Sequence, residues 1–339
     1  EHSRAGTSPR LSWTGNAGVG KWSTSASVSA FRRWVETEER SALKRTRVTT
    51  GALIVDDRGV QTGQGRQTGG SISGRAIWRG AGGQRFEFRP SLGETRSYLT
   101  QSGRTLPEED EDPTLLTSGR ADRSSRNRNW RVESLYSHPW NEARVQWRAT
   151  VGEARARNAI DRVTVPVDPA ATPSTSGELA QYKDRLSQLS VKTSLTTDGG
   201  HSLDVGAEVQ RSRRNASGVT TVGSRIFNPR YDGDIEATID RASLFAQDEW
   251  ALTPSWAAQI GVRADHIKTK AERERSKTDS IGSTIVSPLA HLRWRAPTSA
   301  EQLLPSTVRL SLTRSYNAPD AAQLVSNSND GGVFGASVF

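Results

Sequence analysis

The sequence contains no cysteine and no methionine, and each absence limits what the chain can be. Without cysteine there is neither a disulfide framework nor a cysteine-based metal site. Residue 1 is Glu and not Met, so we expect a processed or truncated chain. No apolar run approaches the roughly 18–20 residues that a membrane-spanning helix needs, and no signal peptide is visible at the start.

Hydrophobic residues are also scarce, at 33% of 339 residues, whereas roughly 45–50% is usual in globular domains. A soluble domain of this length would be expected to bury more apolar surface. A transmembrane β-barrel tolerates the composition, because only every second residue must be apolar, and only within the lipid band. The net charge is +9, but the arginines are spread through alternating positions and loops, which disfavours nucleic-acid binding.

Apolar and polar residues alternate along residues 242–266, and this period of two predicts strands with one apolar and one polar face. The same alternation recurs along the chain. It predicts about twelve strands in six pairs, of which five are joined by a short connection and the sixth by the longer segment 296–306. The expected pairs are 10–17 with 22–36, 69–80 with 84–92, 129–137 with 143–152, 186–197 with 201–210, 242–251 with 256–266, and 285–295 with 307–316.

Long polar segments rich in Gly, Ser, Thr, Arg and Asp separate the pairs, and we expect them to be loops. Short turns that alternate with long loops are typical of bacterial outer-membrane barrels, with the turns periplasmic and the loops extracellular. A soluble sheet would show the same alternation locally, so the asymmetry of the connections is what favours the barrel. The predicted loops are 38–68, 95–128, 156–184, 212–238 and 268–283.

The tryptophans support the same interpretation, because most of the 10 lie within a few residues of the short turns. Aromatic residues collect at membrane interfaces, where the ring is apolar and its polar group stays hydrated. Trp13, Trp34 and Trp130 fit this pattern less well. We therefore predict a periplasmic aromatic girdle made of Trp22, Trp78, Trp140, Trp250, Trp256 and Trp294.

The polar faces of the predicted strands carry many charges, which cannot line a dry core. In residues 256–266, we expect Ala258, Ile260 and Val262 to face lipid, and Gln259, Arg263 and Asp265 to face a hydrated lumen. The charged face is thus predicted to be the interior of an all-β, antiparallel, up-and-down transmembrane barrel.

Two segments resemble recurrent elements of TonB-dependent outer-membrane receptors, a resemblance that is based on motifs over about 240–325 and on topology over 10–210. The first is the hairpin "SLFAQDEWALTPSWAAQIGVRAD", and the second is "RLSLTRSYNAPDAAQL", which follows the strand-like "SPLAHLRW". We interpret the matching residues as structural, belonging to the scaffold. They are Phe245, Ala246, Gln247, Asp248, Trp250, Gly261, Arg263, Asp265, Arg314, Tyr316, Ala318 and Pro319.

The resemblance implies a 22-stranded barrel closed by an N-terminal plug, of which residues 1–339 form a partial barrel of about twelve strands without the plug or the last strands. It also implies a non-enzymatic receptor in the outer membrane of a Gram-negative bacterium. Such a receptor captures a scarce nutrient, most commonly a ferric siderophore, and is driven by the TonB complex through the plug. No cofactor is expected. A passive porin-like barrel and a soluble secreted all-β binding module are the alternatives.

Several other features have a structural explanation beside a functional one. The acidic run Glu108 to Asp112 is interpreted as a solvated loop in preference to a cation site. The Gly-rich residues 58–71 are interpreted as a flexible loop in preference to a phosphate-binding loop. The histidines form no metal-binding pair, and no nucleophile motif is present. Two interpretations stay open for the arginines of the predicted loops: they bind anionic lipopolysaccharide or an anionic ferric chelate, or they keep the loops soluble. These arginines include Arg104, Arg120, Arg123, Arg126 and Arg128.

Overall fold

The structure is a computed structural model that describes most of the chain. The residues it describes are 2–5, 9–46, 53–107, 117–166, 170, 172–197, 199–227, 235–273, 276–296 and 307–314. Within these ranges, no helix is long and apolar enough to cross a membrane.

The described residues form one antiparallel, 14-stranded sheet in which nearly every strand pairs with its neighbours in sequence. The path runs β1-β3-β4-β5-β6-β7-β8-β9-β11-β12-β13-β14, with β2 paired to β3 and β10 paired to β9. The elements are β1 (His2–Ala5), β2 (Arg10–Val19), β3 (Trp22–Thr46), β4 (Leu53–Arg79), the 3₁₀ turn η1 (Ala81–Gly83), β5 (Arg85–Pro107), β6 (Thr117–Trp140), β7 (Ala143–Pro166), β8 (Ser174–Thr196), β9 (His201–Val222), β10 (Arg225–Phe227), β11 (Ile235–Thr253), β12 (Trp256–Arg273), β13 (Ser276–Arg295) and β14 (Thr307–Thr313).

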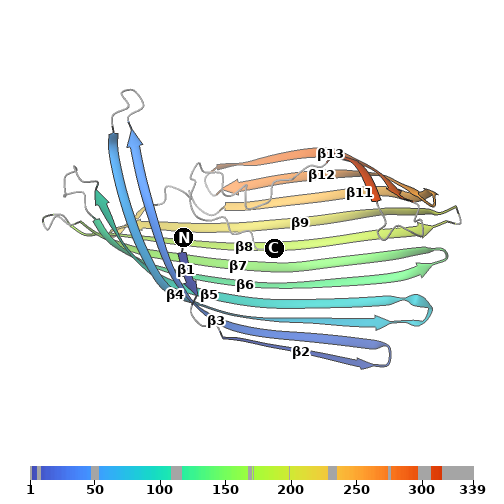
Figure 1. Cartoon of the computed structure of the whole chain (residues 1–339), viewed down its shortest axis with the longest axis horizontal. Coiled ribbons are helices and arrows are strands. Elements are labelled where there is room, and N and C mark those ends of the chain that lie inside the picture. The colour runs from blue at the N-terminus through green and yellow to red at the C-terminus, as the bar shows by residue number, and fades with distance from the viewer. Residues whose placement is uncertain are drawn as a thin grey trace.

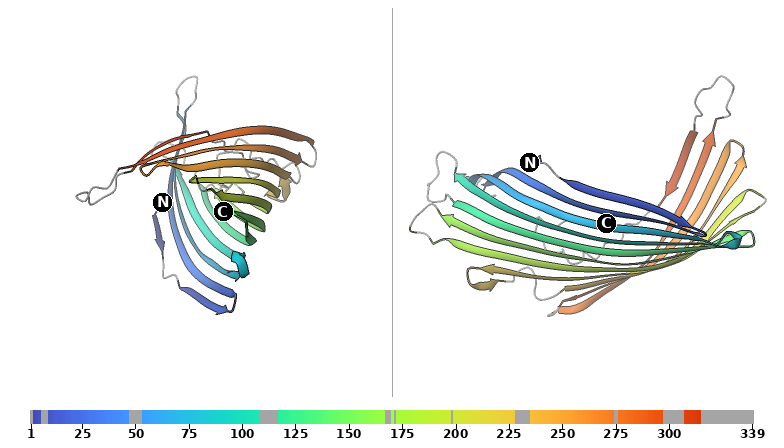
Figure 2. Two further views of the ribbon diagram at one scale, coloured as in Figure 1. Left: turned by 90° about the vertical axis from the view of Figure 1, so that its right-hand side faces the viewer. Right: turned by 90° about the horizontal axis from the view of Figure 1, so that it is seen from below.

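The strands lie side by side as one long, curved layer (Figure 1). Seen end-on in Figure 2, the layer bends into a trough that is open on one side, and its concave face is the one that Figure 1 presents to the viewer. The short turns gather at the right-hand end of Figure 1. This arrangement is a partial barrel.

All six predicted strand pairs are confirmed, as β2/β3, β4/β5, β6/β7, β8/β9, β11/β12 and β13/β14. The tight turns have residues suited to them, because a positive φ is easy for Gly and tolerated by Asn. Gly20 between β2 and β3 has a φ of 57°, and Asn141 between β6 and β7 has a φ of 51°. The short connections of the prediction are therefore hairpin turns.

The prediction of long loops is wrong for most of the residues concerned. The five segments are largely β-strand: β3 continues to Thr46, β4 begins at Leu53, and β5 continues to Pro107. The alternation that predicts a strand arises where one face meets lipid and the other meets the lumen. Beyond the lipid both faces meet water, so the alternation of polarity disappears while the hydrogen-bonded ladder continues.

The Gly-rich residues 58–71, expected as a flexible loop, are likewise part of β4. Their glycines permit close approach to β5: a Cβ added to Gly65 would lie 2.2 Å from the carbonyl oxygen of Tyr98. Because backbone atoms cannot move aside as a flexible side chain does, a side chain at this position would disturb the ladder.

The strand pairings from β3 to β13 keep one register over nearly their whole length. Paired residues of adjacent strands share a face, so every residue can be assigned to the convex or the concave face by its position in the alternation. The convex face carries the exposed large apolar side chains, among them Leu244, Ile260 and Val262. The concave face carries buried polar groups such as Glu87 and Asp265. The prediction that the charged face of the sheet is the inner one is confirmed.

Candidate functional site

A continuous row of aromatic side chains crosses the convex face close to the short turns. Trp22 pairs with Trp78, Trp78 with Phe86, Phe86 with Tyr136, and Tyr136 with Trp147, across β3 to β7. Because paired residues share a face, all five rings point outward from the trough.

The six tryptophans of the predicted girdle all lie on this convex face at the short-turn end. Trp256 and Trp294 are direct partners, and their ring centroids are 6.3 Å apart. Trp250 stacks on His201 with centroids 5.6 Å apart, and Trp140 closes the β6/β7 hairpin. Their common place on the sheet is what a girdle requires, and their contact with a periplasmic membrane interface remains our prediction.

A second row lies further along the same face and was missed from the sequence. Trp13 and Trp130 are the ends of a row that passes through Val28, Ile72 and Leu92, all exposed. From Trp140 back to Trp130, β6 covers about 33 Å at roughly 3.3 Å per residue, or about 25 Å of height at a barrel tilt of roughly 40°. That height equals the apolar band of an outer-membrane barrel.

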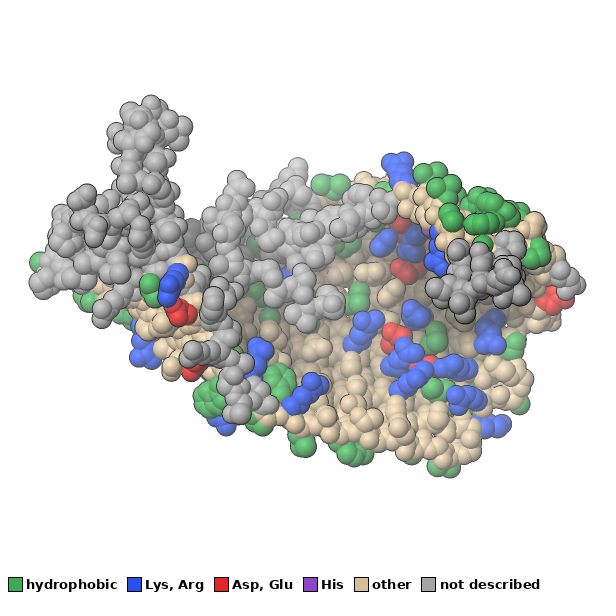
Figure 3. All heavy atoms as spheres, viewed as in Figure 1, with side chains coloured by type: hydrophobic (Ala, Val, Ile, Leu, Met, Phe, Trp, Pro, Cys, Tyr) green, Lys and Arg blue, Asp and Glu red, His purple; other side chains and the backbone are tan. Residues whose placement is uncertain are grey.

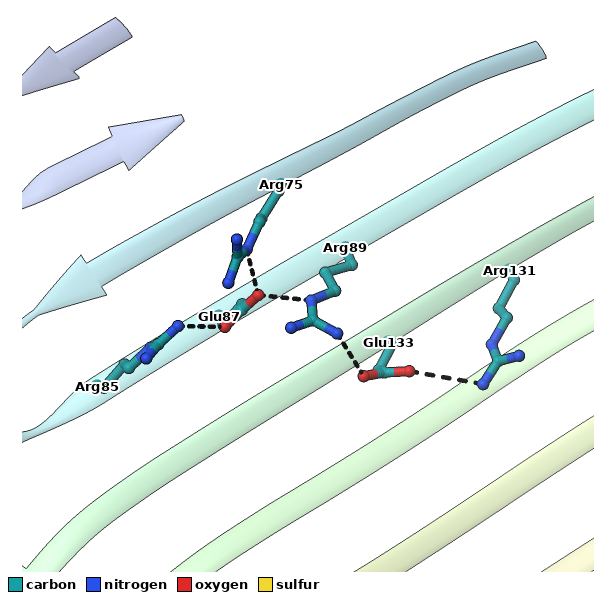
Figure 4. A network of polar contacts seen from close by, with 6 residues as sticks. All are labelled: Arg75, Arg85, Glu87, Arg89, Arg131 and Glu133. Atoms are coloured by element: carbon teal, nitrogen blue, oxygen red, sulfur yellow. Dashed lines mark hydrogen bonds and ion pairs between the residues drawn. The ribbon is translucent and has the colours of Figure 1, made fainter. Parts of the chain in front are cut away.

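On the concave face, Glu87 is the centre of a network of ion pairs (Figure 4). Its carboxylate is 1% exposed and accepts hydrogen bonds from Arg75, from Arg85 at 2.8 Å, and from Arg89 at 2.5 Å. Arg89 also reaches Glu133 at 3.3 Å. A buried carboxylate is stable only when its oxygens are paired, and the three guanidinium groups satisfy this requirement.

Figure 3 shows this concave face, with many Lys, Arg, Asp and Glu side chains visible on the part nearest the short turns. A charged surface of this kind suits a hydrated lumen and not a packed core. The charges belong to side chains from several strands, so the network ties neighbouring strands together across the inside of the trough.

A second network contains the lumen-facing residues of the family-like hairpin. Arg263 donates to Asp265 at 3.0 Å, to Ser243 at 2.8 Å, and to Glu208 at 3.4 Å. Asp265, 5% exposed, also accepts from Ser243 and from Arg241. The Asp265 carboxylate thus joins β11 to β12, which explains why this Arg and Asp occur two residues apart on one face of a strand.

The remaining motif residues of this hairpin divide between the two faces. Phe245, Gln247 and Gly261 lie on the concave face. The guanidinium carbon of Arg263 lies 5.9 Å from the centroid of the Phe245 ring. Gln247 donates to Asp204 at 3.3 Å, which adds β9 to the hairpin's contacts.

The ring of Phe245 lies over Gly206 of β9, where an added Cβ would be only 2.4 Å from the ring. Glycine at this position therefore lets the ring lie flat against the neighbouring strand. Gly206 is a residue whose role the sequence alone does not suggest.

Ala246, Asp248 and Trp250 lie on the convex face of the same hairpin. Asp248 is 2.7 Å from Nδ1 of His201, beside the stacked Trp250 and His201 rings. In the second motif, the backbone N–H of Arg314 donates to the carbonyl of Pro288 at 3.2 Å. Tyr316, Ala318 and Pro319 lie outside the described residues.

Further from the short turns, the concave face carries an apolar patch. Ala216, Ile235, Ala237, Ile239 and Ile267 are all buried, and Tyr182 and Ile285 pack against them. The guanidinium of Arg214 lies 4.9 Å from the centroid of the Tyr182 ring. A buried apolar cluster, an aromatic ring and a cation thus lie together inside the trough, where the guanidinium can attract an organic anion.

The arginines expected in loops are on strands, and they do not share one side of the sheet. Arg120, Arg126 and Arg128 are on the convex face of β6, whereas Arg123 is on the concave face. Arg104 is within β5. The acidic run Glu108 to Asp112 lies outside the described residues. Both interpretations of these arginines remain predictions.

Comparison with known protein families decides the identity of the fold. The model of the family described as TonB dependent receptor-like, beta-barrel matches residues 54–338, which is most of the chain. The chain belongs to this family. Its location is accordingly the outer membrane, and its sheet is part of the family's barrel. The fold expected from the resemblance is confirmed, and the alternative of a soluble secreted module is wrong.

Several solved structures are similar to the chain at low sequence identity. The siderophore receptor PiuA from Acinetobacter baumannii is 13% identical with a TM-score of 0.44, covering 84% of this chain and 48% of its own. The ferric-catecholate import receptor Fiu from E. coli K12 is 11% identical with a TM-score of 0.44, covering 83% and 48%. The outer-membrane protease OmpT from Escherichia coli is 11% identical with a TM-score of 0.24, covering 79% and 95%.

The chain therefore spans about half the length of the two siderophore receptors, at 48% of each. No curated protein sequence matches the chain. The family assignment consequently gives the fold and the membrane, and the cargo has to be inferred from the lumen.

Proposed function

We propose that the chain is the barrel part of a receptor-transporter that takes up a scarce nutrient, and that its cargo is a ferric siderophore. Residues 1–339 would form a partial barrel, and the plug that contacts the TonB complex would lie outside these residues. Binding and conformational change, and not bond chemistry, would carry out the uptake. The family assignment supports the general role, because its members are generally transport proteins.

The observation that carries the choice of cargo is the mixed surface on the concave face of β8, β9, β11 and β12. Tyr182, with the Arg214 guanidinium 4.9 Å from its ring centroid, borders an apolar patch that includes Ile239 and Ile267. A ferric siderophore joins an apolar organic backbone to anionic oxygen donors. The ring of Tyr182 would contact the first, and the Arg214 guanidinium, which is also 3.4 Å from Asp184, would bind the second.

The test is growth under iron limitation with one ferric siderophore at a time as the iron source. A strain in which the full-length protein carries Tyr182→Ala and Arg214→Gln should lose uptake of one siderophore class while its receptor level stays unchanged. Arg120→Gln, on the convex face, is a charge-matched control that should keep uptake.

Two results would contradict this proposal. Deletion of the gene with no growth difference across iron sources would rule out a siderophore cargo. Uptake that does not saturate and persists without TonB would instead favour the passive porin-like alternative.

A further inference from the structure

Further from the short turns than the second row, which ends at Trp13 and Trp130, the convex face changes from apolar to charged on β5, β6, β7, β8, β9, β11 and β12. We call these residues the basic belt. Cations in the belt well outnumber anions. The lipid-facing band beside it carries almost no charged side chains. The belt consists of Glu94, Arg96, Arg126, Arg128, Glu153, Arg155, Arg157, Lys183, Arg185, Arg211, Arg213, Glu236, Asp240, Lys268, Lys270 and Glu272.

The belt lies at the depth of a membrane headgroup layer. On β6, Arg128 and Arg126 follow Trp130 on the same face, and Trp130 marks the end of the apolar band. They are about 7 and 13 Å further along the strand at roughly 3.3 Å per residue. A tilt of roughly 40° places them about 5–10 Å beyond the hydrocarbon, which is where headgroups lie.

Two of the five carboxylates of the belt, Glu94 and Glu153, are each shared by three cations. Glu94 accepts from Nε of Arg96 at 2.5 Å, of Arg126 at 2.9 Å, and of Arg128 at 2.8 Å. Each of these guanidinium groups uses Nε for the contact, and a guanidinium carries five N–H donors. Donors of the terminal nitrogens therefore stay available for a second anion.

Glu153 is arranged in the same way. It accepts from Nε of Arg155 at 2.5 Å and of Arg185 at 3.0 Å, and Lys183 lies 3.5 Å away. Arg157, two residues along β7 on the same face, has no carboxylate partner among the described side chains. The carboxylates thus orient a set of cations whose total charge they do not cancel.

The same side chains line a groove of about 710 Å³. Its cations are Arg126, Arg128, Arg155, Arg157 and Lys183, its carboxylates are Glu236 and Glu272, and its neutral polar side chains are Gln181, Asn215 and Ser217, all on the convex face. A groove of this size falls in the range of small-ligand sites. The five cations outnumber the two carboxylates, so the groove matches a ligand that carries more than one anionic group, linked by a polar framework.

We propose that the groove of the basic belt binds the phosphate groups of lipopolysaccharide in the outer leaflet. The side chains point away from the lumen, so cargo inside the barrel does not reach them. The family's topology places the ends opposite the short turns outside the cell, where the outer leaflet presents phosphorylated sugars at this depth. Arginine forms paired hydrogen bonds with phosphate, and the low-dielectric boundary of the membrane strengthens them.

The proposal is tested with full-length protein isolated as a folded barrel from outer membranes, using fluorescent lipid A in detergent. Arg128→Gln combined with Arg157→Gln should weaken lipid A binding by about tenfold for each arginine removed. Arg128→Lys combined with Arg157→Lys keeps the charge and should lose much less. The matched control is Arg144→Gln combined with Arg148→Gln, which removes two charges from the concave face of β7 and should leave binding unchanged.

Three ligand arms identify the source of the phosphate. Intact lipid A should bind, and this binding should weaken as ionic strength rises. Dephosphorylated lipid A should bind far more weakly, and inorganic phosphate should not compete at millimolar concentration. Equal binding by the belt variant and the unmodified protein would overturn the proposal, as would equal binding of dephosphorylated lipid A or equal loss in the concave-face control. None of these results depends on which cargo the receptor carries.

Discussion

Placing one arginine on either face of β12 tests which face meets lipid. Ile260 is 55% exposed on the convex face, and Gln259, its neighbour in the chain, points to the concave face. Ile260 lies about 10 Å above Trp256 once the strand tilt is included, close to the middle of a band about 25 Å high. An arginine at that depth costs roughly 2–4 kcal/mol, a factor of roughly 30 to 700 in the folding equilibrium.

Ile260→Arg in the full-length protein should therefore lower the free energy of unfolding by about 2–4 kcal/mol, measured by urea titration in lipid vesicles with tryptophan fluorescence. Gln259→Arg adds the same side chain to the lumen, where its partners across the strands are Glu249 and His291. This control should change stability by less than about 1 kcal/mol. Equal costs for the two variants, or a larger cost for Gln259→Arg, would refute the assignment of the faces.

Three further tests concern individual contacts. Glu87→Gln removes the carboxylate shared by three arginines, so the free energy of unfolding in vesicles should fall by about 2 kcal/mol; no change would mean that the network does not stabilise the sheet. Gly65→Val forces a side chain against a backbone oxygen of β5 and should cost about 1–3 kcal/mol. Gly282→Val, with open space around it, is the control and should be tolerated, and both glycine variants are measured by the same unfolding titration in vesicles. Trp22→Ala combined with Trp78→Ala should slow membrane insertion severalfold, whereas an unchanged rate would contradict the girdle.

The alternation of polarity was enough to predict the six hairpins because lipid on one face and water on the other impose it on the sequence. It failed where the strands leave the membrane. The upper parts of β3, β4 and β5 are as regular as their lower parts, but both faces meet water there and the sequence carries no period of two. Hydrogen-bonded register, and not side-chain polarity, defines those residues as strand.

The same limit explains which site features were missed. The sequence alone does not assign Trp130 to a row on the convex face, because the residues that precede it are predicted to be a loop and not part of β6. Ile235 and Ala237 begin β11 inside another predicted loop, so the apolar patch in the lumen had no visible pattern. In contrast, the alternation alone predicts that Arg263 and Asp265 face the lumen, because both are at the height along β12 where the opposite face meets lipid.

The central claim is that the charged concave face is a hydrated lumen and the apolar convex face meets lipid. The chain has no cysteine, so single cysteines can be placed at each position from 257 to 265 and spin-labelled without background. Collision rates with oxygen, which is concentrated in lipid, and with a water-soluble nickel chelate are then measured for the full-length protein in vesicles. Positions 258, 260, 262 and 264 should favour oxygen, and positions 259, 261, 263 and 265 should favour nickel. The opposite alternation, or equal accessibility along the strand, would contradict the claim.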